Sequence, residues 1–264
     1  MNLDRDRTGG FATGLKRALL SCLSAAFAGA LCAAGAVSAA ERCIVIDPGH
    51  GGARDVDESS ANNATSPSGA KEKDLTLEVG REVFEAIENS ADAKRLGIVP
   101  VITRTTDVNV GMTERARIAL ARNTKAFVSI HFNASESHRA QGALGLVQDA
   151  GHGNPNVARD GAYGDALADA VSAVARRYDE KSRPHAFLTD HELKGGRGSF
   201  LLRHLRETAP GRSFPACFLE IDFIDNPAVE AWLVKGEKGK AARAEIARAL
   251  ANALIKYVAE NGGG

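Results

Sequence analysis

The chain has 264 residues, and its 33 Lys and Arg residues balance 33 Asp and Glu residues, so the formal net charge is zero. This balance argues against a nucleic-acid partner, which would require a strongly basic face, and we expect none. No internal repeat or low-complexity tract interrupts the sequence, which is the pattern of a globular protein.

Residues 1–40 have the features of a secretory signal peptide. Four basic residues precede an apolar stretch at 18–37, and the small residues Ser38 and Ala40 follow it. We expect cleavage after about Ala40 and export, to the periplasm or otherwise to the medium or cell wall, with no membrane attachment afterwards. The alternative is a membrane anchor, although the stretch is only weakly apolar. Cleavage leaves 264 − 40 = 224 residues, with 33 − 4 = 29 basic and 33 − 2 = 31 acidic, a net charge of −2.

Strand and helix signals alternate along residues 41–264. In chain order, apolar patterns predict a strand at 43–46, a polar rim loop at 53–69, a helix at 73–89, a strand at 97–103, a helix at 113–122 capped by Thr113, strands at 126–130 and 145–148, a helix at 162–178, a polar loop at 179–198, strands at 199–202 and 216–223, and a helix at 241–258. The alternation predicts a single α/β domain, whose mainly parallel twisted sheet has about six strands and helices on both faces. Its core spans about 43–258.

Two cysteines, Cys43 and Cys217, remain after removal of the signal peptide. Each begins a predicted strand, so both could lie at the same end of one sheet. In an oxidising compartment they could form a disulfide. Two buried free thiols are an equally good interpretation.

The first strand ends abruptly in Asp47-Pro48-Gly49-His50. Proline fixes φ and glycine permits a sharp turn, so this loop can hold one imidazole in a fixed place, as metal and acid–base sites require. The alternative is a tight turn whose histidine bonds to nearby backbone. We also expect the flanking glycines to keep the backbone bare where a substrate must approach.

Two further polar residues lie near the carboxyl ends of predicted strands, where open α/β sheets bind ligands. His131 ends the strand at 126–130, and Glu220 lies within the strand at 216–223. Two histidines and a carboxylate are a common ligand set for catalytic zinc. The spacing does not select the third ligand among the many acidic residues.

Six segments resemble, in order, the zinc-dependent N-acetylmuramoyl-L-alanine amidases of the Amidase_3 family. They are IVIDPGHGG (44–52), KEKDLTLEV (71–79), TRTTD (103–107), ERARIALARN (114–123), FVSIHFNA (127–134) and FLEIDFIDNP (218–227). The resemblance implies a peptidoglycan hydrolase that cleaves the amide between N-acetylmuramic acid and L-alanine. Another zinc peptidase acting on cell-wall peptides, or a non-catalytic wall-binding protein, is the alternative.

The resemblance also implies roles for individual residues. His50, Glu72 and His131 match the ligands of one zinc ion, and Glu220 matches the catalytic acid, which transfers a proton from water to the leaving amine. Asp47 and Asn133 could orient the imidazoles, or could serve the local turns.

Two positions depart from the family pattern. Asp222 replaces a usual glycine, and as a second carboxylate on the same face it should raise the pKa of Glu220, so that Asp222→Gly lowers the pH optimum towards neutral. Phe132 replaces a usually smaller residue, and either shapes the pocket or packs.

No surplus inhibitory segment is evident between residues 148 and 199, so we expect a monomer that is active without an activator. His185 and His191 in the polar loop are expected to be surface residues rather than a second metal site.

Overall fold

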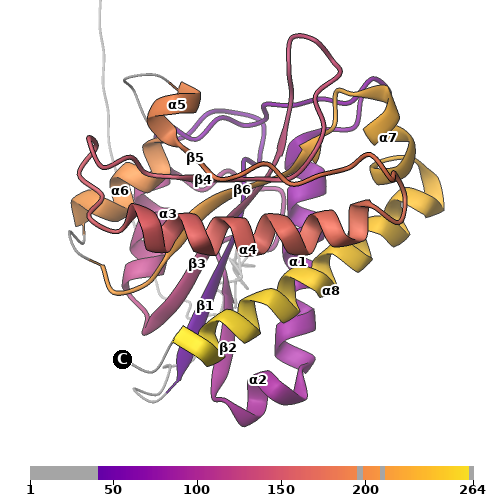
Figure 1. Cartoon of the computed structure of the whole chain (residues 1–264). Helices are drawn as coiled ribbons and strands as arrows, with labels where there is room; N and C mark the ends of the chain where they lie inside the picture. The colour runs from indigo at the N-terminus through magenta and orange to yellow at the C-terminus, as the bar shows by residue number, and fades with distance from the viewer. Residues whose placement is uncertain (1–40, 195–198, 209–211, 262–264) are drawn as a thin grey trace, which may run out of the picture. The chain divides into compact units, whose positions relative to one another are not determined.

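The computed structural model describes residues 41–194, 199–208 and 212–261. The expected signal peptide, residues 1–40, lies outside the described residues. The described part contains a six-stranded sheet of order β2-β1-β3-β6-β4-β5 (Figure 1). The strands are β1 (Arg42–Pro48), β2 (Ile98–Ile102), β3 (Thr124–Asn133), β4 (Leu144–Val147), β5 (Leu188–Thr189) and β6 (Ala216–Phe223). This arrangement confirms the predicted α/β class.

The sheet is mixed, because one of its strands reverses direction relative to its neighbour. Strands β1, β2, β3 and β6 pair in parallel, whereas β4 pairs antiparallel with β6. The carboxyl ends of β1 and β3 therefore meet at one edge, and β6 joins them. The register aligns Asp47 with Ser129 and His131 with Glu220.

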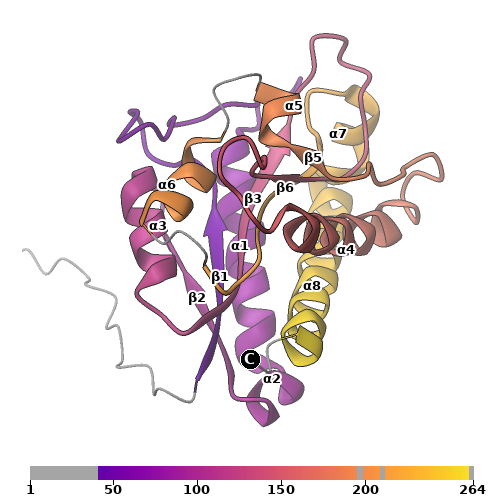
Figure 2. The ribbon, with the colours of Figure 1, turned by 60° about the vertical axis from the view of Figure 1, so that its left-hand side comes forward.

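Helices cover both faces of this sheet, as predicted. They are α1 (Glu72–Asn89), α2 (Ala91–Arg95), α3 (Met112–Leu120), α4 (Val157–Ala175), α5 (Asp190–Lys194), α6 (Phe200–Thr208), α7 (Pro227–Leu233) and α8 (Gly236–Asn261). Figure 2 shows α3 and α6 on one side of the strands and α1, α4 and α8 on the other. Each side has its own apolar core: Ile44 and Ile46 of β1 face the larger one, and Val45 faces the smaller.

The segment around residue 200 contradicts one prediction. The expected strand at 199–202 is instead the start of α6, a helix that packs on α3 and buries Leu201, Leu202 and Leu205. The sixth strand is β5, two residues long, within the expected polar loop at 179–198. The short helices α2, α5 and α7 were not predicted.

The cap of α3 also differs from the prediction. The helix begins at Met112 with Gly111 as its N-cap, so Thr113 is not the cap. Instead, Asp57 of the rim loop accepts the Thr113 N–H at 2.8 Å and, through its carbonyl, the Met112 N–H at 3.0 Å. A carboxylate beside a helix N-terminus stabilises it, and here that carboxylate comes from another part of the chain.

The two cysteines are buried free thiols. Cys43 lies on β1 and Cys217 on β6, with β3 between them, so two strand spacings of about 4.8 Å separate them. Moreover, Cys217 is level with Ile46 across β3 rather than with Cys43. A disulfide needs Cα atoms within about 7 Å, so the fold selects the thiol interpretation.

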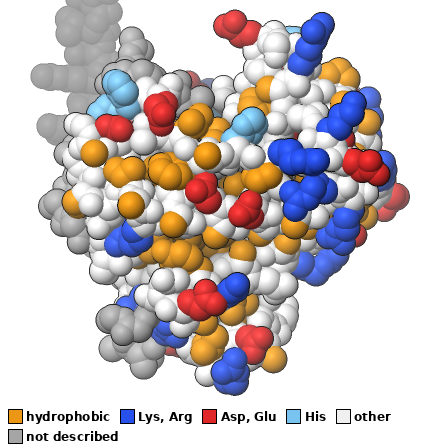
Figure 3. All heavy atoms as spheres, in the orientation of Figure 1, with side chains coloured by type: hydrophobic (Ala, Val, Ile, Leu, Met, Phe, Trp, Pro, Cys, Tyr) orange, Lys and Arg blue, Asp and Glu red, His pale blue; other side chains and the backbone are white. Residues whose placement is uncertain are grey.

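The face formed by α4 and α8 carries charges of both signs. Figure 3 shows Lys and Arg side chains gathered towards the side where α4 ends and α8 begins. Arg177 and Lys235, from these adjoining ends, pair with Glu245 and Glu230, so part of the positive charge is neutralised locally. Among the described residues, no helix is long and apolar enough to cross a membrane.

Candidate metal centre and active site

His50 lies in the turn that follows β1 and has φ +61°. A histidine in this left-handed region is held there by its surroundings rather than by intrinsic preference. Arg115 of α3 supplies that restraint: its guanidinium donates to the carbonyls of Pro48 and His50, both at 2.8 Å, and to the carboxylate of Asp47 at 2.5 Å. Arg104 donates to the carbonyls of Pro48 and Gly49 at 2.9 and 2.8 Å. Two buried arginines therefore fix the loop.

The glycines of this loop serve internal packing. A Cβ at Gly49 would lie 2.1 Å from Cε1 of His131, and one at Gly51, which has φ +133°, would lie 2.0 Å from the carbonyl oxygen of Val108. The first glycine lets the backbone pass against the imidazole, and the second permits both the turn and a close approach. These contacts are internal, and the expectation that the glycines leave room for a substrate stays a prediction.

Glu72 is the first residue of α1 and is buried. Its Oε2 accepts the Ala64 N–H at 2.8 Å, and its Oε1 accepts the Phe132 N–H at 3.1 Å. These two bonds aim Oε1 at the imidazoles. The carboxylate thus does more than complement the dipole of the helix that it begins.

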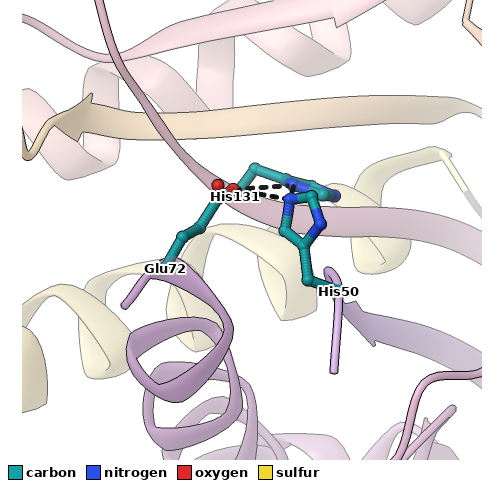
Figure 4. A group of neighbouring side chains, drawn as sticks. All are labelled: His50, Glu72 and His131. Atoms are coloured by element: carbon teal, nitrogen blue, oxygen red, sulfur yellow. Dashed lines mark hydrogen bonds and ion pairs between the residues drawn. The ribbon is translucent and has the colours of Figure 1, made fainter. Parts of the chain in front are cut away.

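Three ligand atoms converge between these elements (Figure 4). His50 Nε2 and His131 Nδ1 each lie 3.0 Å from Glu72 Oε1 and 3.2 Å from one another. A tetrahedral zinc ion with bonds of about 2.0–2.1 Å separates its ligands by about 3.3 Å, so the observed spacing fits zinc. Among the described residues, His185 and His191 belong to no such group.

The protonation states also suit a cation. Nδ1 of His50 lies 3.0 Å from both the carbonyl oxygen and the hydroxyl oxygen of Ser60. A proton on Nδ1, donated to that carbonyl, would leave the Nε2 lone pair for a cation. Burial lowers the pKa of His131 to about 4 and keeps its imidazole neutral. Burial opposes ionisation of Glu72, but hydrogen bonding to the two histidines outweighs it and holds the pKa of that carboxyl below its usual range.

Glu220 lies next to this centre, because the β3–β6 register places it beside His131. Both residues line a cavity of about 290 Å³. One part of the wall is polar and another apolar, and the lining residues are His50, Glu58, Ser60, Asn63, Met112, His131, Leu146, Ser199, Leu201, Phe218 and Glu220. The ring of Phe218 stacks on His131 with centroids 3.6 Å apart. The cavity thus brings Glu220 together with two of the three candidate ligands, His50 and His131.

The remaining residues that the sequence singled out have different contacts in the structure. Asp47 is buried and reaches His131 only through Ser129, a residue that the sequence did not single out. The side chain of Asn133 accepts the Ala134 N–H at 2.8 Å, which is turn chemistry. Phe132 is fully buried in the larger core, so it packs. Arg104 and Arg115 were within matched segments but had no predicted role.

Asp222 is buried at the end of β6, and its Oδ1 accepts the N–H groups of Gly142 and Phe223 at 2.7 and 2.8 Å. Burial raises the pKa of its carboxyl to about 6, although the two hydrogen bonds act to lower it. The charge of Asp179 also raises this pKa, and that of His185 lowers it. Asp222 therefore fixes the backbone of the β3–β4 connection.

Comparison with known proteins finds similarity over most of the chain. The family model described as N-acetylmuramoyl-L-alanine amidase matches residues 44–253. N-acetylmuramoyl-L-alanine amidase AmiA of Escherichia coli (strain K12) is 28% identical over 251 residues, which cover 83% of this chain and 77% of that protein. AmiC of Neisseria meningitidis serogroup B is 27% identical over 234 residues, 81% of this chain and 52% of that protein.

Solved structures share the fold. The amidase AmiC2 of Nostoc punctiforme superposes with a TM-score of 0.57 at 23% identity, covering 82% of this chain and 97% of that one. The catalytic domain of CwlV from Bacillus (Paenibacillus) polymyxa gives 0.59 at 18% identity, covering 83% and 98%. The match to the family model over most of the chain confirms the resemblance seen in the sequence, and the chain belongs to the N-acetylmuramoyl-L-alanine amidase family, Amidase_3.

Proposed function

We propose that the protein hydrolyses the amide between N-acetylmuramic acid and L-alanine in peptidoglycan, with one zinc ion held by His50, Glu72 and His131. The observation that carries the proposal is the convergence of His50 Nε2, His131 Nδ1 and Glu72 Oε1 within 3.2 Å of one another. Two of these ligands, His50 and His131, line one cavity with Glu220. Membership of the amidase family supplies the substrate class.

The reaction divides between the ion and the chain. A zinc ion held by His50, Glu72 and His131 would supply Lewis-acid polarisation of the scissile carbonyl and would lower the pKa of a water molecule. Glu220 accepts a proton from the attacking water and delivers it to the nitrogen of the leaving L-alanine. Phe218, Leu146 and Leu201 exclude water from the apolar part of the cavity, where the polar interactions of the substrate gain strength.

Metal analysis of the purified protein, paired with mass spectrometry of digested peptidoglycan, tests the proposal. We expect one zinc per chain, intact stem peptides with free L-alanine amino termini, and glycan strands without peptides. Glu220→Gln should retain zinc and lose activity by a factor of about 100 or more. Cleavage inside the stem peptide would instead identify a zinc peptidase. If no products form and chelation of the metal changes nothing measurable, the protein would be a non-catalytic wall-binding protein.

Export and regulation complete the proposal. Residues 1–40 act as a signal peptide, and the mature chain works in the periplasm as a monomer without an obligatory activator. Mass spectrometry of the mature amino terminus should place cleavage after about Ala40, and the purified protein alone should release stem peptides. An uncleaved chain, or activity that appears only with a second protein, would contradict these points.

A further inference from the structure

A chain of three buried polar side chains leads from the sheet to the candidate metal centre. The β1–β3 register places Asp47 opposite Ser129, and His131 follows two residues later on the same face. The hydroxyl oxygen of Ser129 lies 2.6 Å from Asp47 Oδ2 and 3.1 Å from His131 Nε2. All three residues are at least 95% buried, so water does not compete for these bonds.

The surroundings of Asp47 set the direction of the chain. Its other oxygen, Oδ1, receives hydrogen bonds from Arg115 and Thr103, both at 2.5 Å. An ionised carboxylate only accepts, so the single hydroxyl proton of Ser129 must point at Oδ2. The lone pairs of Ser129 are then left to accept a proton-bearing nitrogen, which is Nε2 of His131.

We propose that Ser129, oriented by Asp47, is a positioning residue that holds His131 in the Nε2–H tautomer and so presents the Nδ1 lone pair to the metal. The inference rests on the proposed function only for the identity of the metal. At the other imidazole, Nδ1 of His50 lies 3.0 Å from both the carbonyl and the hydroxyl of Ser60.

Removing the hydroxyl should release this control. In Ser129→Ala, Nε2 loses its acceptor, whereas Glu72 Oε1 still lies 3.0 Å from Nδ1. The proton should then move to Nδ1, where it opposes metal binding. Long-range ¹H–¹⁵N spectra of histidine-labelled, metal-free protein distinguish the two tautomers. In the metal-free protein Ser129 and Glu72 compete for this proton. We expect a larger fraction of Nε2–H in the wild type than in the variant, and zinc affinity in the variant lower by about 10- to 100-fold in a chelator competition.

Ser172→Ala is the matched control. Ser172 is also fully buried, but it lies on α4, and its hydroxyl has no hydrogen-bond partner among the described residues. This control should keep the Nε2–H tautomer of His131 and the wild-type zinc affinity. The comparison separates the effect of breaking the Asp47–Ser129–His131 chain from the effect of deleting any buried hydroxyl.

Asp47→Asn tests the direction of the chain. The amide oxygen should replace Oδ1 beside Arg115 and Thr103, so that the amide N–H₂ faces Ser129 and donates to it. The Ser129 hydroxyl would then donate to His131 Nε2 and reverse the tautomer to Nδ1–H. An Nε2–H tautomer retained in both Ser129→Ala and Asp47→Asn, or unchanged zinc affinity in Ser129→Ala, would overturn the inference. Because the tautomer is read without metal or substrate, this failure is distinct from failure of the proposed amidase activity.

Discussion

Gly49 lies against the imidazole of His131, so closely that a Cβ at position 49 would fall 2.4 Å from Nε2 and 2.1 Å from Cε1. The backbone of one ligand loop therefore forms the surface on which the other ligand rests. Gly49→Ala should displace the His131 ring, because neither the backbone held by Arg104 nor the buried strand can give way. We expect a folded protein whose zinc affinity falls at least tenfold, measured by chelator competition.

Gly69→Ala is the control for this substitution. Gly69 has φ +90°, but a Cβ there would meet nothing within 4 Å. The variant should lose about 1–2 kcal/mol of stability through backbone strain and keep its zinc affinity. Equal zinc affinities in the Gly49 and Gly69 variants would show that the close approach to His131 is not needed.

The Asp47–Arg115 ion pair should dominate the stability of the ligand loop. Both side chains are about 1% exposed. Arg115→Met leaves the Asp47 charge buried without its partner, and should lower the free energy of unfolding by about 3–5 kcal/mol. Urea denaturation measures the change. Arg117→Met, on the same helix but exposed and paired only with Glu114 at the surface, should barely move the midpoint. Similar losses in both variants would contradict a special role for Arg115.

Asp222 should make stability depend on pH. The pKa of its carboxyl is raised from 3.8 to about 6 in the folded protein, so the native state binds the extra proton. Its contribution to stability is then fully present below about pH 4 and is lost as the pH rises through 6. By pH 7 the loss reaches about 3 kcal/mol. Asp222→Asn keeps the acceptor for Gly142 and Phe223 and removes the charge. It should be more stable than the wild type at pH 7 and equally stable at pH 4, and a difference independent of pH would refute this origin.

The effect of Asp222 on catalysis is a separate question. If its carboxylate raises the pKa of Glu220, then Asp222→Gly should move the pH optimum of peptidoglycan hydrolysis down towards neutral. The pH–rate profile of the variant decides this. An unchanged optimum would mean that the Gly142 bond confines the influence of Asp222 to the loop.

Cys43 and Cys217 should titrate as two thiols in the mature protein. Thiol titration of unreduced protein should detect little reaction under native conditions and two equivalents in denaturant, because both side chains are fully buried. A reductant should leave the melting temperature unchanged. Absence of free thiols after denaturation would show that the chain can form a disulfide that this fold does not accommodate.

The sequence predicted the secondary structure best where the apolar patterns were long. The helices containing Val79 and Leu250 have their buried stripes where the periodicity placed them. The run at 199–202 was too short to separate a strand from a helix by periodicity. Leu205, one turn beyond Leu201, is the residue that reveals the helical spacing, and its burial against α3 decides the outcome.

The site was predicted unevenly for a related reason. His50 and His131 could be placed at strand ends from the sequence, whereas Glu72 required the resemblance to a family, because a carboxylate at a helix start has a sufficient local explanation. Ser129 was missed because its role depends on the β1–β3 register, which pairs it with Asp47. Its position two residues before His131 put both on one face, and this was the available signal.

The three candidate ligands come from the turn after β1, from α1 and from β3, so the site does not exist until these elements have assembled. Metal binding and folding are consequently linked equilibria: an ion that binds only the folded chain adds RT ln(1 + [Zn]/Kd) to the free energy of unfolding, about 2.7 kcal/mol at 100 times Kd. Zinc supply would then set how long each molecule survives proteolysis, as well as how fast it works.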